Sequence, residues 1–144
     1  MNKIIDNIIL NALKEDIPTI DVTTDNLFSN EVSEGVFIAN EPGIISGVEV
    51  MRRVFNLIDE EVYFKVINGD GFEVDKEDII AIISGKSSSM LKGERVALNL
   101  FQRMCGIATL TSKFVKEVES LNTKILDTRK TTPNLRILEK MAVV

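Results

Sequence analysis

Histidine is absent from the 144 residues, and cysteine occurs once, at Cys105. The lack of histidine removes the commonest general base and the commonest zinc ligand from the chemistry available to the chain. A single cysteine rules out a disulfide within the chain and is compatible with a reducing cytosol. We therefore expect a cytoplasmic protein whose chemistry depends on other side chains.

Long apolar runs, glycine-rich phosphate loops and an excess of positive charge are also missing. No stretch approaches the roughly 20 apolar residues that a membrane span needs, and neither GxGxxG nor GxxxxGK[ST] occurs. The formal net charge is −5, which argues against binding to nucleic acid or to an anionic membrane. An anionic ligand would have to be bound by a local cluster of cations. With 44% hydrophobic residues, the chain can still bury a core.

The first 85 residues mix helical and strand patterns. Apolar residues at helical spacing predict two helices, over 2–15 and 48–58. Short apolar or alternating runs between turn residues predict four strands: two within 34–47, and one each over 61–67 and 77–85. The sequence NGDG at 68–71 is typical of a hairpin turn. This part of the chain is therefore predicted to be a mixed α+β unit.

The remainder of the chain has the pattern helix, strand, helix. Helical periodicity continues for more than thirty residues, with Ser89 as a candidate N-cap and Gly106 as an expected joint between two helices. A strand is predicted over 124–127, and a final helix would begin with Thr132 as N-cap and Pro133 at its first position. This order is typical of parallel α/β folds.

Two adjacent cations, Arg129 and Lys130, follow the strand predicted over 124–127. Ligands bind at the carboxyl ends of the strands in parallel α/β folds. The position therefore favours an anion-binding role, and a solvated surface pair is the plain alternative. Neighbouring residues point to opposite sides, so one cation could bind a ligand while the other supports the scaffold.

Other motifs that could carry chemistry are interpreted as structural. Glu94 and Arg95 lie near the start of a helix, where a charge pair with an exposed cation is the simplest interpretation. Cys105 is interpreted as a small packed side chain, because no histidine is available to activate its thiol. A lipoyl- or biotinyl-carrier domain is disfavoured because neither Lys76 nor Lys86 lies in the sequence setting that such carriers need.

The chain resembles the quinolinate phosphoribosyltransferase family in two segments, ERVALNLFQRMCGIATLT from residue 94 and ILDTRKTTPNLRILEKMAV from residue 125. Shorter matches occur at DVTT (residues 21–24), at GIISG (residues 43–47) and at Asp70-Gly71. The resemblance runs the length of the chain. The combination of DTRKT with the upstream ER and GIAT makes it specific.

The resemblance implies an α+β N-terminal sandwich domain, at residues 1–104 here, followed at residues 105–144 by the start of an incomplete α/β barrel of the type II phosphoribosyltransferase class. It also implies a homodimer or higher homo-oligomer, in which the N-terminal domain of one subunit covers the barrel mouth of another. The implied reaction joins quinolinate to phosphoribosyl pyrophosphate and gives nicotinate mononucleotide, carbon dioxide and pyrophosphate in NAD biosynthesis. Mg²⁺ is the implied cofactor, bound with phosphoribosyl pyrophosphate.

Carried over to this chain, the resemblance assigns substrate binding to Arg95, Thr128, Arg129 and Lys130. Arg129 and Lys130, with Thr128 alongside, would bind the quinolinate carboxylates, and Arg95 would reach into the neighbouring subunit's site. A guanidinium fork suits a planar carboxylate. The implied mechanism is mainly electrostatic and needs no covalent nucleophile. Lys140 matches a characteristic family position, but no catalytic role is assigned to it.

Family members are expected to be roughly twice as long as this chain, because a barrel domain of ~200 residues follows the first domain. The sequence, which stops at Val144, therefore looks like the front half of a longer protein. The resemblance implies that the remaining acidic, histidine and lysine residues of the family's site lie beyond Val144. No catalytic residue and no metal ligand is accordingly assigned within the 144 residues.

Two consequences and two alternatives complete these expectations. We expect exposed apolar surface in the last third of the chain, and no turnover by this chain alone. One alternative to quinolinate phosphoribosyl transfer is the function of a homologue, in the same superfamily, that is associated with molybdenum-transport operons. The other is a non-catalytic interaction module built on the N-terminal domain.

Overall fold

The computed structural model of the chain describes residues 3–19 and 31–143. The DVTT motif at residues 21–24 and the last residue, Val144, lie outside these ranges. The described helices and strands are α1 (Lys3–Asp16), β1 (Val32–Ile38), β2 (Gly43–Ile44), α3 (Val48–Ile58), β3 (Tyr63–Val66), β4 (Glu73–Val74), β5 (Ile79–Lys86), α4 (Ser87–Val118) and α5 (Arg136–Met141). The predicted helices over 2–15 and 48–58 and the four predicted strands up to residue 86 are thereby confirmed.

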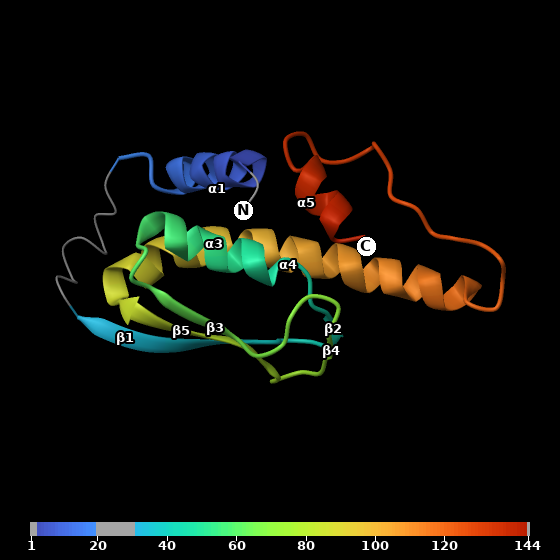
Figure 1. The fold of residues 1–144 in the computed structure, drawn as a ribbon, viewed down its shortest axis with the longest axis horizontal. Helices are drawn as coiled ribbons and strands as arrows, with labels where there is room; N and C mark the ends of the chain where they lie inside the picture. The colour runs from blue at the N-terminus through green and yellow to red at the C-terminus, as the bar shows by residue number, and fades with distance from the viewer. Residues whose placement is uncertain (1–2, 20–30, 144) are drawn as a thin grey trace.

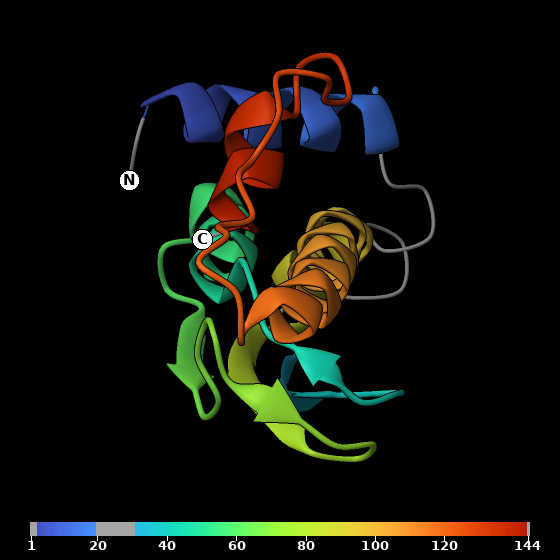
Figure 2. The same ribbon diagram turned by 90° about the vertical axis from the view of Figure 1, so that its right-hand side faces the viewer.

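The elements are arranged in three layers (Figures 1 and 2). The strands form one outer layer, and α3 and α4 cover one face of it. Helices α1 and α5 lie on the far side of α3 and α4, as the contacts of α1 with α3 and α4 and of α5 with α4 also show. The middle layer is therefore covered on both sides, which explains why it contributes most of the core.

The strands form two small antiparallel sheets. One has the order β1-β5-β3, and the other pairs β2 with β4. In the larger sheet, Phe64 lies opposite Ile83. Phe37, Phe55 and Phe64 form a cluster whose ring centroids are 5.9–6.0 Å apart. These rings join the sheet to α3, because Phe55 belongs to the helix and the other two belong to strands.

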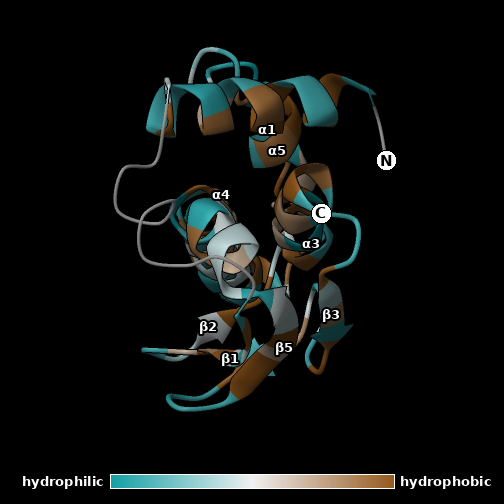
Figure 3. Ribbon diagram, turned by 90° about the vertical axis from the view of Figure 1, so that its left-hand side faces the viewer, coloured by the Kyte–Doolittle hydropathy of each residue, from teal (hydrophilic) through white to brown (hydrophobic). Residues whose placement is uncertain are grey.

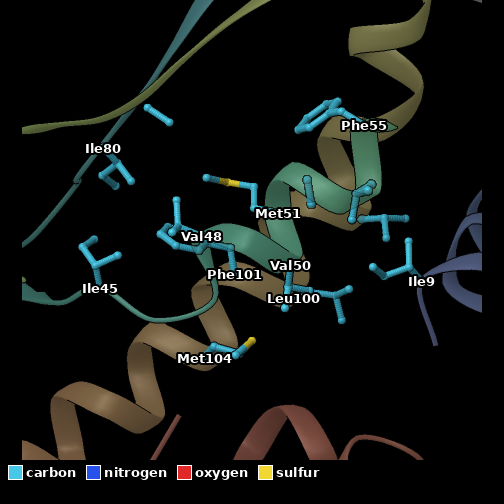
Figure 4. Close-up of a cluster of buried hydrophobic side chains, with 14 of the residues drawn as sticks. Ile9, Ile45, Val48, Val50, Met51, Phe55, Ile80, Leu100, Phe101 and Met104 are labelled. Atoms are coloured by element: carbon cyan, nitrogen blue, oxygen red, sulfur yellow. The ribbon is translucent and has the colours of Figure 1, made fainter. Parts of the chain in front are cut away.

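Helices α3 and α4 pack closely at the centre of the core (Figure 4). Met51, Val54 and Phe55 of α3 and Met104 of α4 are fully buried. At Gly93 the two helices come so near that an added Cβ would lie 2.7 Å from a ring carbon of Phe55. A glycine at this position therefore sets the distance between the two helices.

Helix α1 packs on the middle layer through its apolar residues, which Figure 3 shows in brown among polar ones. Ile5 and Ile9 are buried. Asp6 accepts two hydrogen bonds from Arg53 of α3, at 2.9 Å to Nε and 3.0 Å to Nη2. These bonds from Arg53 lower the pKa of Asp6. The bidentate geometry fixes the orientation of α1 as well as its contact with α3.

Helix α4 is continuous over 32 residues, so the expected joint at Gly106 is wrong. A glycine within a helix costs only about 0.5–1 kcal/mol relative to alanine, and burial of the neighbouring Met104 outweighs this. Ser89 is not the N-cap, because the helix begins at Ser87 and the Ser89 hydroxyl donates to the Asp59 carboxylate at 2.7 Å. Neither α4 nor any other described helix combines the length and apolar character needed to cross a membrane.

The strand predicted over 124–127 does not form. A strand exists through hydrogen bonds to a neighbour, and within the described ranges no other strand pairs with these residues. Leu126 is accordingly 80% exposed. The final helix begins later than predicted, at Arg136. Thr132 is not its N-cap, because Asn134 has a φ of 68°, a left-handed conformation that interrupts helical backbone.

The turn at 68–71 is also not a hairpin, because β3 pairs with β5 while β4 pairs with β2. Its residues instead support the segment before α3. The Gly71 N–H donates to the Ile45 carbonyl at 2.8 Å, and an Asp70 carboxylate oxygen accepts from the Val48 N–H at 2.9 Å. Asp70 thus satisfies a free N–H group at the start of α3.

The last third of the chain exposes apolar side chains, as predicted. They are Leu110, Phe114, Val115, Leu121, Leu126 and Met141. The exposure is concentrated on the second half of α4 and the loop that follows it. At α5 the pattern is mixed, because Met141 is exposed while Leu138 of the helix and Ala142 directly after it are buried in the core.

Replacing Gly93 by alanine tests the close approach of α3 and α4. We expect Gly93→Ala to lower the free energy of unfolding by about 1–3 kcal/mol, because the new methyl group overlaps the Phe55 ring. Gly106→Ala is the matched control: its Cβ meets nothing within 4 Å, so it should stabilise α4 by up to about 1 kcal/mol. Urea unfolding followed by circular dichroism measures both, and equal effects of the two variants would contradict the packing argument.

Candidate functional site: a cationic loop supported by α5

The cations Arg129 and Lys130 lie in the loop between α4 and α5 (Figure 1). Both are exposed, as is Thr128. The Thr128 hydroxyl accepts a hydrogen bond from the Lys130 N–H at 3.1 Å, which closes a tight turn. Within the described part of the chain, neither the Arg129 nor the Lys130 side chain has a hydrogen-bond or ion-pair partner. Both charges are therefore available to a ligand.

Side chains of α5 contact this loop from one side. Arg136 donates from Nε to the Thr131 hydroxyl at 3.0 Å and from Nη2 to the Arg129 carbonyl at 3.2 Å. One turn further on, Lys140 Nζ lies 2.8 Å from a carboxylate oxygen of Asp127. Lys140, the family position without an assigned role, is thus engaged in an ion pair that supports the start of the loop.

A second set of contacts ties the end of the loop to α4. Arg103 donates from Nε to Glu139 Oε1 at 2.9 Å and from Nη2 to the Thr132 hydroxyl. The other Glu139 oxygen accepts from the Thr132 N–H at 3.1 Å. Partial burial pushes the pKa of Glu139 upward, but the hydrogen bonds from Arg103 and Thr132 outweigh this effect and lower the pKa. Glu139 is therefore ionised at neutral pH, and its pair with Arg103 is intact.

Sequence reasoning missed Arg103, Arg136 and Glu139 as contributors to this region. A signal was present, since Arg136 and Glu139 stand three apart in a short helix directly after the cation motif, which places them on one side of it. Arg103 had no comparable signal, because its partner lies 36 residues away in sequence.

Arg95 is not part of this cluster. It lies in the first half of α4, where Nε donates to both carboxylate oxygens of Asp16 at the end of α1, at 3.0 and 3.2 Å. Its side chain is 62% exposed. In Figure 1 the first half of α4 lies on the left of the molecule, whereas the loop before α5 runs from the right-hand end of α4 back to α5. Within one chain, the structure therefore does not bring Arg95 together with the residues at 128–130.

Two of the matched motifs, GIISG and GIAT, lie side by side and support the scaffold. The Thr109 hydroxyl accepts from the Ile44 N–H at 2.9 Å, and a Cβ added at Gly43 would lie 2.8 Å from that oxygen. The Cys105 sulfur accepts from the Ser46 N–H at 3.3 Å. Burial raises the pKa of the Cys105 thiol to about 11, so the group is protonated at neutral pH. This supports its interpretation as a packed side chain.

The residues described here do not form a metal site by themselves. No group of three or more acidic or cysteine side chains that could hold a metal ion occurs in residues 3–19 and 31–143. Asp127, within the cationic loop, and Glu139, which accepts from the Thr132 N–H at its end, are each paired with a cation.

The resemblance assigns no catalytic residue to the 144 residues. Val144 lies outside the described ranges, and the described residues end at Val143, two residues after α5. The acidic, histidine and lysine residues that the resemblance places beyond Val144 are not among the 144 residues. Their position stays a prediction, and the site described here consists of substrate-binding candidates alone.

Comparison with known proteins shows the family. The model described as "Quinolinate phosphoribosyl transferase, N-terminal domain" matches residues 21–105, and the model of the C-terminal domain matches residues 107–144. The chain belongs to the quinolinate phosphoribosyltransferase family. The resemblance seen in the DTRKT, ER and GIAT motifs is thus confirmed.

Curated relatives of the quinolinate phosphoribosyltransferase family give the same result. A probable nicotinate-nucleotide pyrophosphorylase (carboxylating) of Bacillus subtilis is 43% identical over 129 residues, which are 90% of this chain and 45% of that protein. A protein of the same name from Synechocystis is 40% identical over 96% of this chain and 47% of its own length. The chain thus spans about half the length of these relatives.

Solved structures of quinolinate phosphoribosyltransferase relatives confirm the fold class. NadC from Streptococcus pyogenes superposes with a TM-score of 0.92 at 39% identity, covering 96% of this chain and 51% of the other. The nicotinate-nucleotide pyrophosphorylase of Francisella tularensis gives 0.93 at 34% identity, covering 99% and 51%. The fold is therefore the α+β N-terminal sandwich domain followed by the start of the incomplete α/β barrel.

The raised pKa of Cys105 makes a prediction for thiol chemistry. At pH 8, we expect iodoacetamide to alkylate the folded chain roughly 100-fold more slowly than the chain in 6 M guanidinium chloride, because a thiol with the ordinary pKa of about 8.5 has far more thiolate. Mass spectrometry of quenched samples measures the two rates. Comparable rates would show that Cys105 is ionised in the folded protein and would reopen a nucleophilic role.

The lowered pKa of Glu139 predicts how stability depends on pH. The ionised group stabilises the fold above its ordinary pKa of about 4.3, and this contribution is lost as the pH falls through the lower pKa of the folded state. We expect Glu139→Gln to unfold at lower urea concentration at pH 7 and to converge with the wild type only once the pH falls below the lowered pKa of Glu139 in the folded state. Glu117→Gln, an exposed position on α4, is the control, and a constant Glu139→Gln deficit at all pH values would contradict this account.

Proposed function

We propose that the chain takes part in phosphoribosyl transfer to quinolinate with decarboxylation, which gives nicotinate mononucleotide, carbon dioxide and pyrophosphate in cytoplasmic NAD biosynthesis. Membership of the family supports this, and so do the names of the relatives, which favour quinolinate over the molybdenum-operon alternative. The observation that carries the proposal is the loop in which Arg129 and Lys130 are exposed and unpartnered while the surrounding residues are engaged.

Arg129 and Lys130 bind the two carboxylates of quinolinate, with Thr128 beside them. Quinolinate is a planar dianion, and the planar guanidinium of Arg129 can donate two parallel hydrogen bonds to one carboxylate. Lys130 supplies a compact second charge that can turn toward the other carboxylate. The Thr128 hydroxyl already accepts from the Lys130 N–H, so its own proton remains available for a ligand oxygen.

Arg95 contributes to the site of a neighbouring subunit in a homodimer. Its exposure and its distance from the loop within one chain support a role across an interface rather than within the subunit. Asp16, its partner in this chain, orients the guanidinium in the absence of ligand. Such an arginine gives a site that is complete only when two copies assemble.

The reaction itself is driven by positioning and electrostatics. The cations neutralise the quinolinate carboxylates and hold the ring nitrogen in line with the anomeric carbon of the phosphoribosyl group. Pyrophosphate is the leaving group and carries away the negative charge. Magnesium would enter with phosphoribosyl pyrophosphate and neutralise its phosphates. Loss of the 2-carboxylate follows because the positively charged ring accepts the electrons. We propose no turnover by the 144 residues alone, since they span about half of each relative.

Removing the guanidinium of Arg129 tests the proposal directly. Saturation-transfer NMR detects weak binding, and we expect a quinolinate signal with the wild-type chain that falls at least tenfold in Arg129→Gln, because a charge-assisted bidentate contact is lost. Arg52→Gln is the matched control: Arg52 is an exposed arginine of α3 paired with Glu49, far from the loop in sequence.

The result distinguishes a chain that binds substrate through Arg129 from a non-catalytic interaction module. Equal quinolinate signals in Arg129→Gln and wild type would contradict the assignment of Arg129. Product formation by the isolated chain, supplied with quinolinate, phosphoribosyl pyrophosphate and Mg²⁺, would contradict the claim that further residues are needed. Chromatographic separation of nicotinate mononucleotide from quinolinate measures this second outcome.

A further inference from the structure

We propose that Arg136 is a positioning residue: its guanidinium fixes the backbone at Arg129, so that the Arg129 and Lys130 side chains are presented together to an anionic ligand. The inference rests on the proposed function for its ligand, quinolinate. It goes beyond it in assigning a role to Arg136, whose own side chain is directed at the loop backbone and not left available for a ligand.

The geometry is that of one planar group contacting two points of the loop. Nη2 of Arg136 donates to the Arg129 carbonyl at 3.2 Å, and Nε donates to the Thr131 hydroxyl at 3.0 Å. These two acceptors flank Lys130. Because the guanidinium is rigid, the two bonds fix the Arg129–Lys130 peptide and the Thr131 side chain, on either side of Lys130, relative to α5. A flexible ammonium could contact one acceptor at a time and would leave the other free.

The loop needs such support because it has no regular secondary structure of its own. Its ends are tied by two separate ion pairs, Lys140 with Asp127 before the cations and Arg103 with Glu139 after them. Between these ends, the loop is held by the Thr128 turn and by the two bonds from Arg136. Arg136 therefore supports the part of the loop that carries the charges.

Arg136 contributes little to the packing of α5 itself. It is exposed, and it is the first residue of the helix. The helix packs on the core through Leu138 and Ala142, which are 2% exposed each. Loss of the Arg136 side chain should thus release the loop without detaching α5. This separation makes positioning distinguishable from a general structural role.

The expected effect on binding is entropic. A loop that is ordered before binding does not have to be ordered by the ligand, and each side chain that must be immobilised on binding weakens affinity. We expect Arg136→Lys, which keeps the charge but loses the fork, to weaken quinolinate binding roughly fivefold to tenfold. Arg136→Gln should weaken it at least as much. Arg52→Lys on α3, an exposed arginine paired with Glu49, should leave affinity unchanged.

The experiment combines two measurements on the 144-residue chain and these variants. NMR titration with quinolinate gives the affinity, and ¹⁵N relaxation gives backbone order parameters for residues 127–132 and for α5. We expect the wild-type loop to be as ordered as α5, and both Arg136 variants to lower the order parameters at 129–131 below about 0.6 while α5 stays rigid.

Each outcome decides the matter. If Arg136→Lys binds quinolinate as tightly as the wild type and only Arg136→Gln binds it more weakly, Arg136 acts through its charge. That result would overturn the positioning role. Unchanged order parameters in both variants would overturn it as well. If the wild type does not bind quinolinate, the proposed function fails, and the relaxation comparison still decides whether Arg136 holds the loop. Loss of order in α5 as well would assign Arg136 a structural role instead.

Discussion

The close approach of α3 and α4 at Gly93 is the constraint on which the rest of the structure depends. With no side chain at this position, the Phe55 ring packs directly against the α4 backbone, and the same ring contacts Phe37 and Phe64 of the sheet. Helix α4 also contacts β2, β5, α1 and α5. The spacing of two helices thus sets where the sheet lies, where α1 and α5 can pack, and where the loop after α4 begins.

The cationic loop is ordered by side chains and not by a sheet. Within the described ranges no strand lies beside residues 124–127 to pair with them, so main-chain hydrogen bonding cannot fix the loop there. Three polar residues of α5 replace it: Arg136, Glu139 and Lys140 each contact the segment between Asp127 and Thr132. This helix is only six residues long, yet it buries Leu138 and so has a fixed position from which its polar face can act.

The elements of the fold that could be predicted from the sequence are those that depend on local residue patterns. The helix over 48–58 follows from apolar spacing, and β5 follows from a short apolar run. The joint at Gly106 was wrong because a local propensity of about 1 kcal/mol is smaller than the packing on either side of it. The strand at 124–127 was wrong because strand formation depends on a neighbour, which local sequence does not reveal. The candidate site shows the same division, since Arg129 was found from its motif while Arg103, 36 residues from Glu139, was not.

The charge pattern around the loop explains how an acidic protein keeps two cations available. With 22 acidic against 17 basic residues, an arginine at or near the surface readily pairs with a carboxylate, as Arg52, Arg53 and Arg95 each do. Asp127 belongs to the same loop as Arg129, and Glu139 contacts the end of this loop at Thr132. Each is already neutralised, by Lys140 and Arg103, so neither draws Arg129 into an internal pair. The ion pairs that order the loop therefore also remove the anions that would compete with a ligand.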